Sequence, residues 1–527
     1  MDKITGFFSG LDIANIFQDI KDFFLNLWSQ IDTGKVVQVL KYDMSNPLLF
    51  NTGLFLLLFV GFLIIYRILR KCKWLKLIFV ILFSLYFYYK SSAEYCFILL
   101  GVCISDYILG ILMGIASRNW VRRLIVAVNV LMNVGMLVYF KYFNLLLSTF
   151  ANFSGQEFNA LDIVLPAGIS FFTFRSISYI VDIYRREIEP CTDFLAYTFY
   201  LTFFPPLLAG PVVRAKDMLP QVKLNPVASR AMVGEGLFLI IIGLVKKVIV
   251  ADYISQNFVD RIFDNPSLYS GFENLMGVYG FTIQLYCDFS GYSDMAIGIA
   301  LLLGYRFLDN FRSPFKSQSP TEFWRRWHIS LSTWLRDYVY IPMGGNRCSK
   351  TRRNMNQMNT MLIGGLWHGA SWMYLIWGGL QGIFLIGHKE LKGLFGTKVP
   401  KDTPQVKKEK SRWRVIGNIF LTFNLIAISF VFFRARSLET VRDMGNQIIH
   451  NFHLSVAPQF IQGYLMIVLA IVGAYLMHFA PERWTHKFKK MYTGMPLIFQ
   501  AIVLAIILLL IIQVRSSEIV PFIYLQY

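Results

Sequence analysis

Long apolar runs separated by short polar connections recur along almost the whole 527-residue chain. A helix needs about 20 mainly apolar residues to cross the hydrocarbon core of a bilayer. The runs occupy residues 47–66, 75–89, 95–115, 124–140, 161–184, 194–213, 232–250, 272–303, 416–433, 464–479 and 497–514. With the less regular region 355–386, the pattern predicts about 11 to 13 transmembrane or re-entrant helices. We therefore expect an all-α polytopic membrane protein.

The first 45 residues follow a different pattern. Apolar residues recur at helical spacing from Ile13 to Ile31 with polar residues between them, which predicts an amphipathic helix lying in the membrane interface or against a partner. This region lacks the features of a cleaved signal peptide. We divide the chain into this region, 1–45, and a membrane domain, 46–527. The membrane domain comprises a motif core at 161–386, a basic cytoplasmic loop at 387–414, and C-terminal helices with a tail at 415–527.

Composition and charge agree with a membrane protein. Hydrophobic residues make up 55% of the chain and charged residues 16%, and the net charge is +19. The basic residues gather in short connections such as 67–76 and 118–123, and in the polar stretches 306–353 and 389–414. This distribution is typical of cytoplasmic loops that face anionic lipid headgroups. Membrane lipid is therefore an expected partner, and nucleic acid is not.

Two apolar segments are interrupted in ways that indicate polar surroundings. FFPPLLAGPVVR at 203–214 should break a spanning helix at its prolines. The segment 284–300 places Asp288, Ser290 and Asp294 in an apolar frame. Such groups need a partner or a water-filled cavity. Each acid alone is explained by helix capping or by pairing with a nearby Arg, whereas the cluster indicates a polar cavity, so we treat all three as candidate channel-lining residues.

The segment FWRRWHISLSTWLRDYVYIPMGGNR, residues 323–347, has helical periodicity but is too charged to span a membrane. Its tryptophans and arginines predict a helix at the headgroup level that ends at Pro342. Arginine presents a planar fork to phosphate, so the segment suits either a phosphate-bearing ligand or anionic lipid. The candidate donor-binding residues are Arg325, Arg326, Arg336, Trp327 and Trp334.

Two of the seven histidines, His328 and His368, lie in the segments richest in tryptophan and glycine. His368 stands in GGLWHGASW, residues 364–372, where the glycines allow close approach of another backbone. An imidazole titrates near neutrality and suits a general base, although a lone intramembrane histidine is often a packing residue. No third or fourth ligand at plausible spacing accompanies the pair, so no metal site is predicted.

Five motifs in this order resemble the membrane-bound O-acyltransferase (MBOAT) family, and within it the alginate O-acetyltransferase branch. They are SFFTFRSISYIVDIYR (170–185), FFPPLLAGPVVRA (203–215), DFSGYSDMAIGIALLLGY (288–305), the stretch 310–347 and GLWHGASW (365–372). The resemblance implies helices arranged around a central channel. It also implies that His368 is the catalytic residue and His328 the second member of the pair. Trp367, directly before His368, is a further candidate channel-lining residue.

The resemblance further implies a function. An acyl group, expected to be acetyl, would pass from a cytoplasmic thioester through the bacterial cytoplasmic membrane for O-acetylation of an extracytoplasmic polysaccharide or cell-wall glycan. The donor would be acetyl-CoA or an acyl carrier protein, with no permanently bound cofactor, and an extracytoplasmic acetyltransferase would be a partner. The C-terminal PFIYLQY is similar to a motif whose tyrosine, here Tyr524, carries the acyl group, but it departs from that motif at Leu525. An interfacial tyrosine is the alternative.

Other functions stay open at this stage. Another acyl group, such as D-alanine, would use the same chemistry. A transporter or flippase also needs broken helices and buried polar groups, but it should show an internal repeat, and none is found. A membrane scaffold would leave the two histidines without a role.

Overall fold

The computed structural model describes residues 33–43, 46–395, 411–514 and 522. Every regular element in these ranges is a helix. The predicted amphipathic helix at 13–31, residues 396–410 of the predicted basic loop, and Tyr524 lie outside the described residues. Of region 1–45, the structure includes the short helix α3 (Thr33–Leu40).

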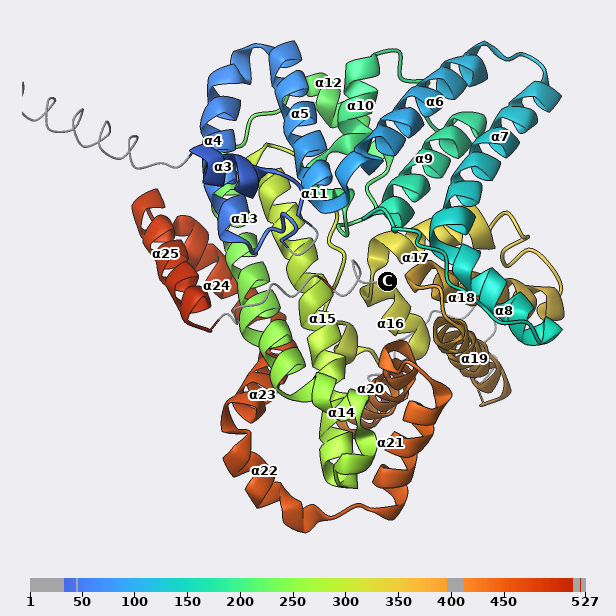
Figure 1. Ribbon diagram of the computed structural model, residues 1–527, viewed down its shortest axis with the longest axis vertical. Helices are drawn as coiled ribbons and strands as arrows, with labels where there is room; N and C mark the ends of the chain where they lie inside the picture. Colours follow the sequence, from blue (N-terminus) through green and yellow to red (C-terminus); the bar gives the residue numbers. More distant parts are fainter. Residues whose placement is uncertain (1–32, 44–45, 396–410, 515–521, 523–527) are drawn as a thin grey trace, which may run out of the picture.

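Apolar helices follow α3, and the first four of them lie in the upper part of the molecule (Figure 1). They are α4 (Gly53–Ile68), α5 (Lys73–Ser92), α6 (Cys96–Ile115), α7 (Asn119–Leu137) and α8 (Phe143–Ser154). A π-helical turn, Val138–Tyr142, joins α7 to α8. α4 and α5 meet at a basic turn, and the side chain of Thr52 accepts a hydrogen bond from the Phe55 N–H at the start of α4.

The helices that follow range from a single turn to a continuous helix of 32 residues. They are α9 (Ile169–Tyr184), α10 (Phe194–Thr202), α11 (Phe204–Leu207), α12 (Ala215–Leu224), α13 (Arg230–Leu244), α14 (Asp260–Asp264) and α15 (Gly271–Leu302). The predicted break at Pro205 and Pro206 is confirmed, because these residues form only the single turn of α11. α13 continues into a π-helical segment, Val245–Asp252, and packs closely along α15.

The remaining helices follow α15, and α20 to α23 lie in the lower part of the molecule (Figure 1). They are α16 (Pro320–Arg326), α17 (Ile329–Leu335), α18 (Lys350–His368), α19 (Trp372–Phe395), α20 (Arg412–Arg434), α21 (Leu438–His450), α22 (Ala457–Gly463), α23 (Leu465–Phe479), α24 (Glu482–Gly494) and α25 (Leu497–Val514). α19 extends to Phe395, so the first nine residues of the predicted loop 387–414 are helical.

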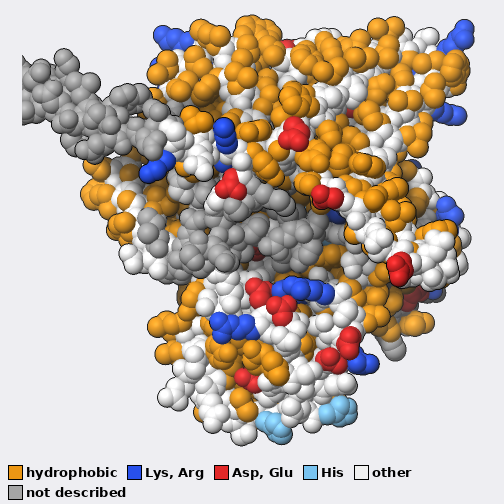
Figure 2. Space-filling model, in the orientation of Figure 1, with side chains coloured by type: hydrophobic (Ala, Val, Ile, Leu, Met, Phe, Trp, Pro, Cys, Tyr) orange, Lys and Arg blue, Asp and Glu red, His pale blue; other side chains and the backbone are white. Residues whose placement is uncertain are grey.

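The predicted all-α membrane architecture is confirmed. Among the described residues, four continuous helical stretches are long and apolar enough to cross a membrane, or up to six if each bent pair is one span. Figure 2 shows apolar side chains covering most of the face over α4 to α7. Several other predicted runs became helices that are broken or, like the 16-residue α9, too short to cross a membrane. Fewer helices than runs therefore qualify as continuous spans.

Candidate active site

His368 is the last residue of α18 and is 3% exposed. Its ring is enclosed by aromatic side chains of three helices, which meet it edge-to-face. The ring centroids lie 5.0 Å from Trp367, 5.0 Å from Trp377 of α19, and 5.3 Å from Phe433 of α20. This cage sets the orientation of the imidazole and keeps bulk water away from it.

The glycines of the His368 motif bring α18 and α19 together. A Cβ atom on Gly365 would lie 2.3 Å from the carbonyl oxygen of Tyr374 and 3.1 Å from the Cα atom of Gly378. No side chain fits in that space, so the two backbones touch at this crossing. The predicted close backbone approach is present, and it places His368 against Trp377.

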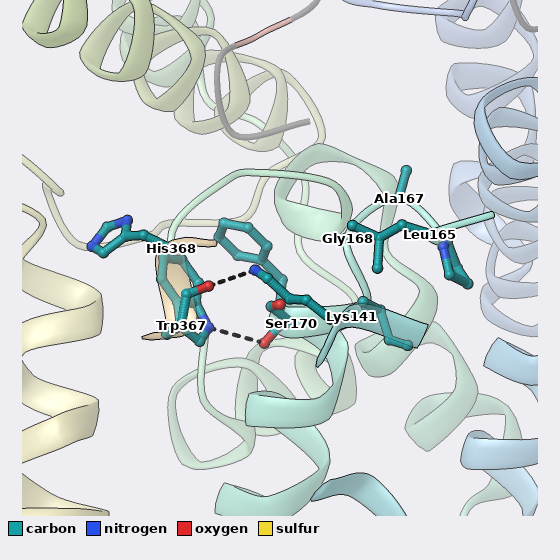
Figure 3. A pocket seen from close by; sticks show the side chains of 10 residues that line it. Lys141, Leu165, Ala167, Gly168, Ser170, Trp367 and His368 are labelled. Atoms are coloured by element: carbon teal, nitrogen blue, oxygen red, sulfur yellow. Dashed lines mark hydrogen bonds between the residues drawn. The ribbon is translucent and has the colours of Figure 1, made fainter. Parts of the chain in front are cut away.

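The C-terminal end of α18 is capped by side chains from another part of the chain (Figure 3). Lys141 Nζ donates to the carbonyl oxygen of Trp367 at 2.6 Å, and Tyr142 Oη donates to that of Leu366 at 2.7 Å. The last carbonyls of a helix have no partner within the helix, so external donors are needed when the end is buried. Sequence reasoning missed this pair, although a lysine at the end of the apolar run 124–140 was a visible signal.

A small cavity of about 30 Å³ borders this helix end. Its lining is Lys141, Trp367, His368 and residues 165–171. In Figure 3 the His368 ring points away from Lys141, on the other side of Trp367. Lys141 therefore acts on the position of the helix end, and it does not face the imidazole directly.

His328 interrupts the predicted interfacial helix. It lies between α16 and α17 in the left-handed region, with φ of 42°, and it is fully buried. This conformation is strained for a residue with a side chain. The prediction of one continuous helix ending at Pro342 was therefore wrong, because the chain turns at His328.

Asn310 holds His328 in place. The Nδ1 atom of His328 lies 3.2 Å from Asn310 Oδ1, and Ser330 Oγ donates to the same oxygen at 2.9 Å. The amide Nδ2 of Asn310 donates to Ser293 Oγ at 3.1 Å. Because an amide oxygen only accepts hydrogen bonds, Nδ1 of the imidazole donates in this contact. Asn310 falls in a recognised motif, but sequence reasoning did not single it out.

Trp367 joins the two predicted histidines. Its ring centroid lies 5.6 Å from that of His328 and 5.0 Å from that of His368. Its indole N–H donates to the carbonyl of Ser170, at 3.5 Å. Residues 40 positions apart thus meet around one indole in the interior.

The two acidic candidates for the channel lining form ion pairs. Asp288 lies 2.5 Å from Nζ of Lys247, and Asp294 lies 2.6 Å from Nζ of Lys246. Within the described ranges, Asp288, Asp294 and the buried Ser290 do not line the four cavities of about 30, 200, 400 and 820 Å³. The pairing expected of each acid alone is present, with lysines of the π-helical segment in place of the expected Arg. The channel-lining role of the cluster stays a prediction.

The donor-binding candidates divide into two groups. Arg325 and Arg336 line a cavity of about 400 Å³, together with Trp324 and Lys389. We call it the basic cavity. The other three candidates face elsewhere: Arg326 pairs with Glu322 at 2.9 Å, Trp327 stacks on Phe323, and Trp334 stacks on Phe174 with centroids 3.7 Å apart. Sequence reasoning missed Lys389 because it assigned that residue to a loop.

A larger cavity of about 820 Å³ shares Ile329, Thr333 and Arg336 with the basic cavity. Asp337 stands at its wall, paired with Arg214 at 2.8 Å and with Arg336 at 2.6 Å. Burial raises the pKa of the Asp337 carboxyl, but the two guanidinium groups outweigh burial and leave the pKa below its usual value. Both cavities thus lie against the charged segment that contains α17.

The family model described as MBOAT, membrane-bound O-acyltransferase family, matches residues 190–434. The chain is 38% identical to the probable alginate O-acetylase AlgI of Pseudomonas aeruginosa over 399 residues, covering 74% of this chain and 73% of that protein. The chain belongs to the MBOAT family. It is therefore an O-acyltransferase and a multi-pass membrane protein.

Two further relatives differ in the acyl group that their names state. The peptidoglycan O-acetyltransferase of Helicobacter pylori is 36% identical over 426 residues, covering 75% of this chain and 78% of that protein. The teichoic acid D-alanyltransferase of Streptococcus thermophilus is 30% identical over 285 residues, covering 50% of this chain and 67% of that protein. The MBOAT match contains both histidines, whereas Lys141 and Tyr142 precede it.

Proposed function

We propose that this MBOAT protein moves an acetyl group from a cytoplasmic thioester, through the bacterial cytoplasmic membrane, for O-acetylation of an extracytoplasmic polysaccharide or cell-wall glycan. The observation that carries the proposal is the buried contact of His328 and His368 with Trp367. The basic cavity lies along α18, the helix that ends at His368. The relatives named as O-acetylases match about three quarters of the chain, and the D-alanyltransferase matches half.

The donor enters through the basic cavity. Its lining includes Arg325, Arg336 and Lys389, which suit the phosphates of coenzyme A or of a carrier-protein arm. Met361 of α18 also lines this cavity, seven residues before His368. At 1.5 Å per helical residue, the reacting imidazole lies about 10 Å deeper along the helix. A thin, extended thioester arm can bridge that distance while its phosphate stays among the cations.

His368 is the general base of the transfer. The acceptor hydroxyl oxygen attacks the thioester carbonyl carbon, and the hydroxyl proton passes to the imidazole. The carbon–sulfur bond breaks, and the thiolate takes that proton as it leaves. The aromatic cage excludes water, which would otherwise hydrolyse the thioester. His328, held by Asn310, contacts the same Trp367 ring and completes the site.

Tyr524 is proposed as the first acceptor, which then passes the acetyl group to an extracytoplasmic acetyltransferase partner. Supporting this role, Phe522 is 1% exposed, with its ring edge-on to Tyr292 and 4.4 Å from Nζ of Lys247. Phe522, two residues before Tyr524 in the sequence, thus lies in the protein interior. The alternative is direct transfer to an outside hydroxyl.

The test supplies purified protein in nanodiscs with acetyl-labelled coenzyme A or acetyl carrier protein, and it follows the label by intact mass and peptide mapping. We expect label on Tyr524 in the wild type, and its loss in both His368→Ala and Tyr524→Phe. Loss of the base should slow transfer by about 10²–10⁴-fold. His453→Ala, which changes an exposed histidine, is the matched control and should behave as the wild type.

Other outcomes would change the proposal in defined ways. Turnover in Tyr524→Phe but not in His368→Ala would mean direct transfer without the tyrosine. Turnover with a D-alanyl carrier protein and none with acetyl donors would replace the acetyl group by D-alanine. Full activity in His368→Ala would overturn the assignment of the base.

A further inference from the structure

A pocket outside the catalytic region lies where the α4–α5 turn meets the connection between α12 and α13. Its volume is about 200 Å³. The lining is Leu63, Tyr66, Arg67, Arg70, Lys76, Pro226, Val227, Ala228, Val233 and Leu302. Three cations are thus among these described lining residues, and no carboxylate is. Neither the donor nor the acceptor of the transfer reaction accounts for the pocket.

Lys76 is the cation at the base of this pocket. The residue is 1% exposed. Its Nζ atom lies 3.4 Å from the carbonyl oxygen of Pro226 and 5.2 Å from the centre of the Tyr66 ring. In the described part of the chain, no carboxylate lies within 4.0 Å of the cationic groups of Lys76, Arg67 or Arg70. A buried ammonium without a counter-charge is unfavourable, so the pocket is electrostatically suited to an anion.

The surroundings of the pocket match a lipid better than a soluble anion. α4 and α5 both belong to stretches that qualify as membrane spans, and the pocket lies where they join. Large apolar side chains around it are exposed, among them Ile68, Trp74, Leu75, Leu224 and Val227. Exposed tryptophan beside clustered Lys and Arg is typical of the level of the lipid headgroups. The apolar wall formed by Leu63 and Leu302 suits the start of an acyl chain.

We propose that this pocket binds the headgroup phosphate of an anionic phospholipid, with Lys76 at its base and Arg67 and Arg70 at its rim. The lipid would join segments that are distant in the sequence. The hydroxyl of Tyr66 donates to the carbonyl oxygen of Leu303, and Asn225 Nδ2 lies 3.4 Å from the carbonyl oxygen of Arg70. A phosphate between these segments therefore fastens the N-terminal helices to α13 and to the end of α15.

The test is native mass spectrometry of the full-length protein. The protein is transferred from detergent into phosphatidylcholine nanodiscs with or without phosphatidylglycerol. It is then released from the nanodiscs, and the mass of the protein with any bound lipid is measured. We expect one phosphatidylglycerol retained by the wild type. Arg67→Gln with Arg70→Gln should weaken retention about 25-fold, since each cation near an anionic surface contributes roughly a factor of five. Lys76→Met should weaken it as well.

The matched control is Arg118→Gln with Arg123→Gln, which removes two exposed cations from another basic connection and should leave retention unchanged. If Lys76→Met does not fold, the rim variant decides, because its two residues are exposed. Equal retention in the rim variant and the wild type would overturn the proposal. Displacement of phosphatidylglycerol by inorganic phosphate at equal concentration would also overturn it, in favour of a soluble anion. None of these readouts depends on acyl transfer.

Discussion

Lys141 donates a 2.6 Å hydrogen bond to the carbonyl oxygen of Trp367, the residue directly before His368. This bond ties the π-helical turn after α7 to the helix end that carries His368, the proposed general base. The turn lies outside the 190–434 match, so the N-terminal helices help to hold the candidate active site.

Replacing Lys141 by Met should lower the rate of acyl transfer by about 10²-fold, because a misplacement of about 1 Å costs that much in an oriented reaction. The expected signature is a fall in kcat with little change in the donor KM, since the basic cavity lies elsewhere. Lys141→Arg should retain part of the rate. Lys392→Met, which changes an exposed lysine, is the control, and an unchanged kcat in Lys141→Met would contradict the positioning role.

Asn310→Ala should destabilise the protein and slow acyl transfer, because Asn310 Oδ1 serves both His328 and Ser330. Leaving buried polar groups without their partner costs about 1–3 kcal/mol. Thermal unfolding in detergent and donor turnover measure the two effects. Ser293→Ala removes only the partner of the amide N–H group, so it should lower activity much less. An equal loss of activity in Asn310→Ala and Ser293→Ala would show that the amide oxygen of Asn310 contributes no more to transfer than its amide N–H group.

Arg325 and Arg326 are neighbours in the sequence but face different surroundings. Arg325 lines the basic cavity, whereas Arg326 pairs with Glu322. Arg325→Ala should raise the donor KM about 10-fold with kcat preserved, as expected for one lost hydrogen bond to a charged group. Arg326→Ala is the matched variant and should change KM by less than about threefold. A larger effect at Arg326 would place the donor outside the basic cavity.

The sequence was sufficient for the parts of the site that depend on local pattern. Apolar runs predicted the helices, and the Trp–Gly segments predicted the His328–His368 pair. It did not reveal Lys141, Asn310 or Lys389, because each acts through a contact with a segment distant in the chain. The bend at His328 was hidden as well, since helical periodicity continues through a residue that tertiary contacts hold at positive φ.

Asp337 predicts a dependence of stability on acid pH. Its folded pKa lies below its usual value of about 3.9, so its ion pairs stabilise the protein above that pH. The contribution falls as the pH drops through the folded pKa. Asp337→Asn should therefore lower Tm at pH 6, and the difference from the wild type should shrink below about pH 4. A difference that stays constant down to pH 3 would contradict this linkage.

The crossing of α18 and α19 predicts opposite results for two glycines of the same helix pair. Gly365→Ala would place a Cβ 2.3 Å from the Tyr374 carbonyl oxygen, so the helices must move apart, at a cost of about 1–3 kcal/mol. His368 lies one turn further along α18, and acyl transfer should fall with the stability. At Gly387 of α19, an added Cβ would meet no described atom within 4 Å, and Gly387→Ala should stabilise the helix by up to about 1 kcal/mol. Unfolding temperature and turnover of both variants check the contrast. A Gly365→Ala protein as stable and active as the wild type would show that the crossing does not position His368.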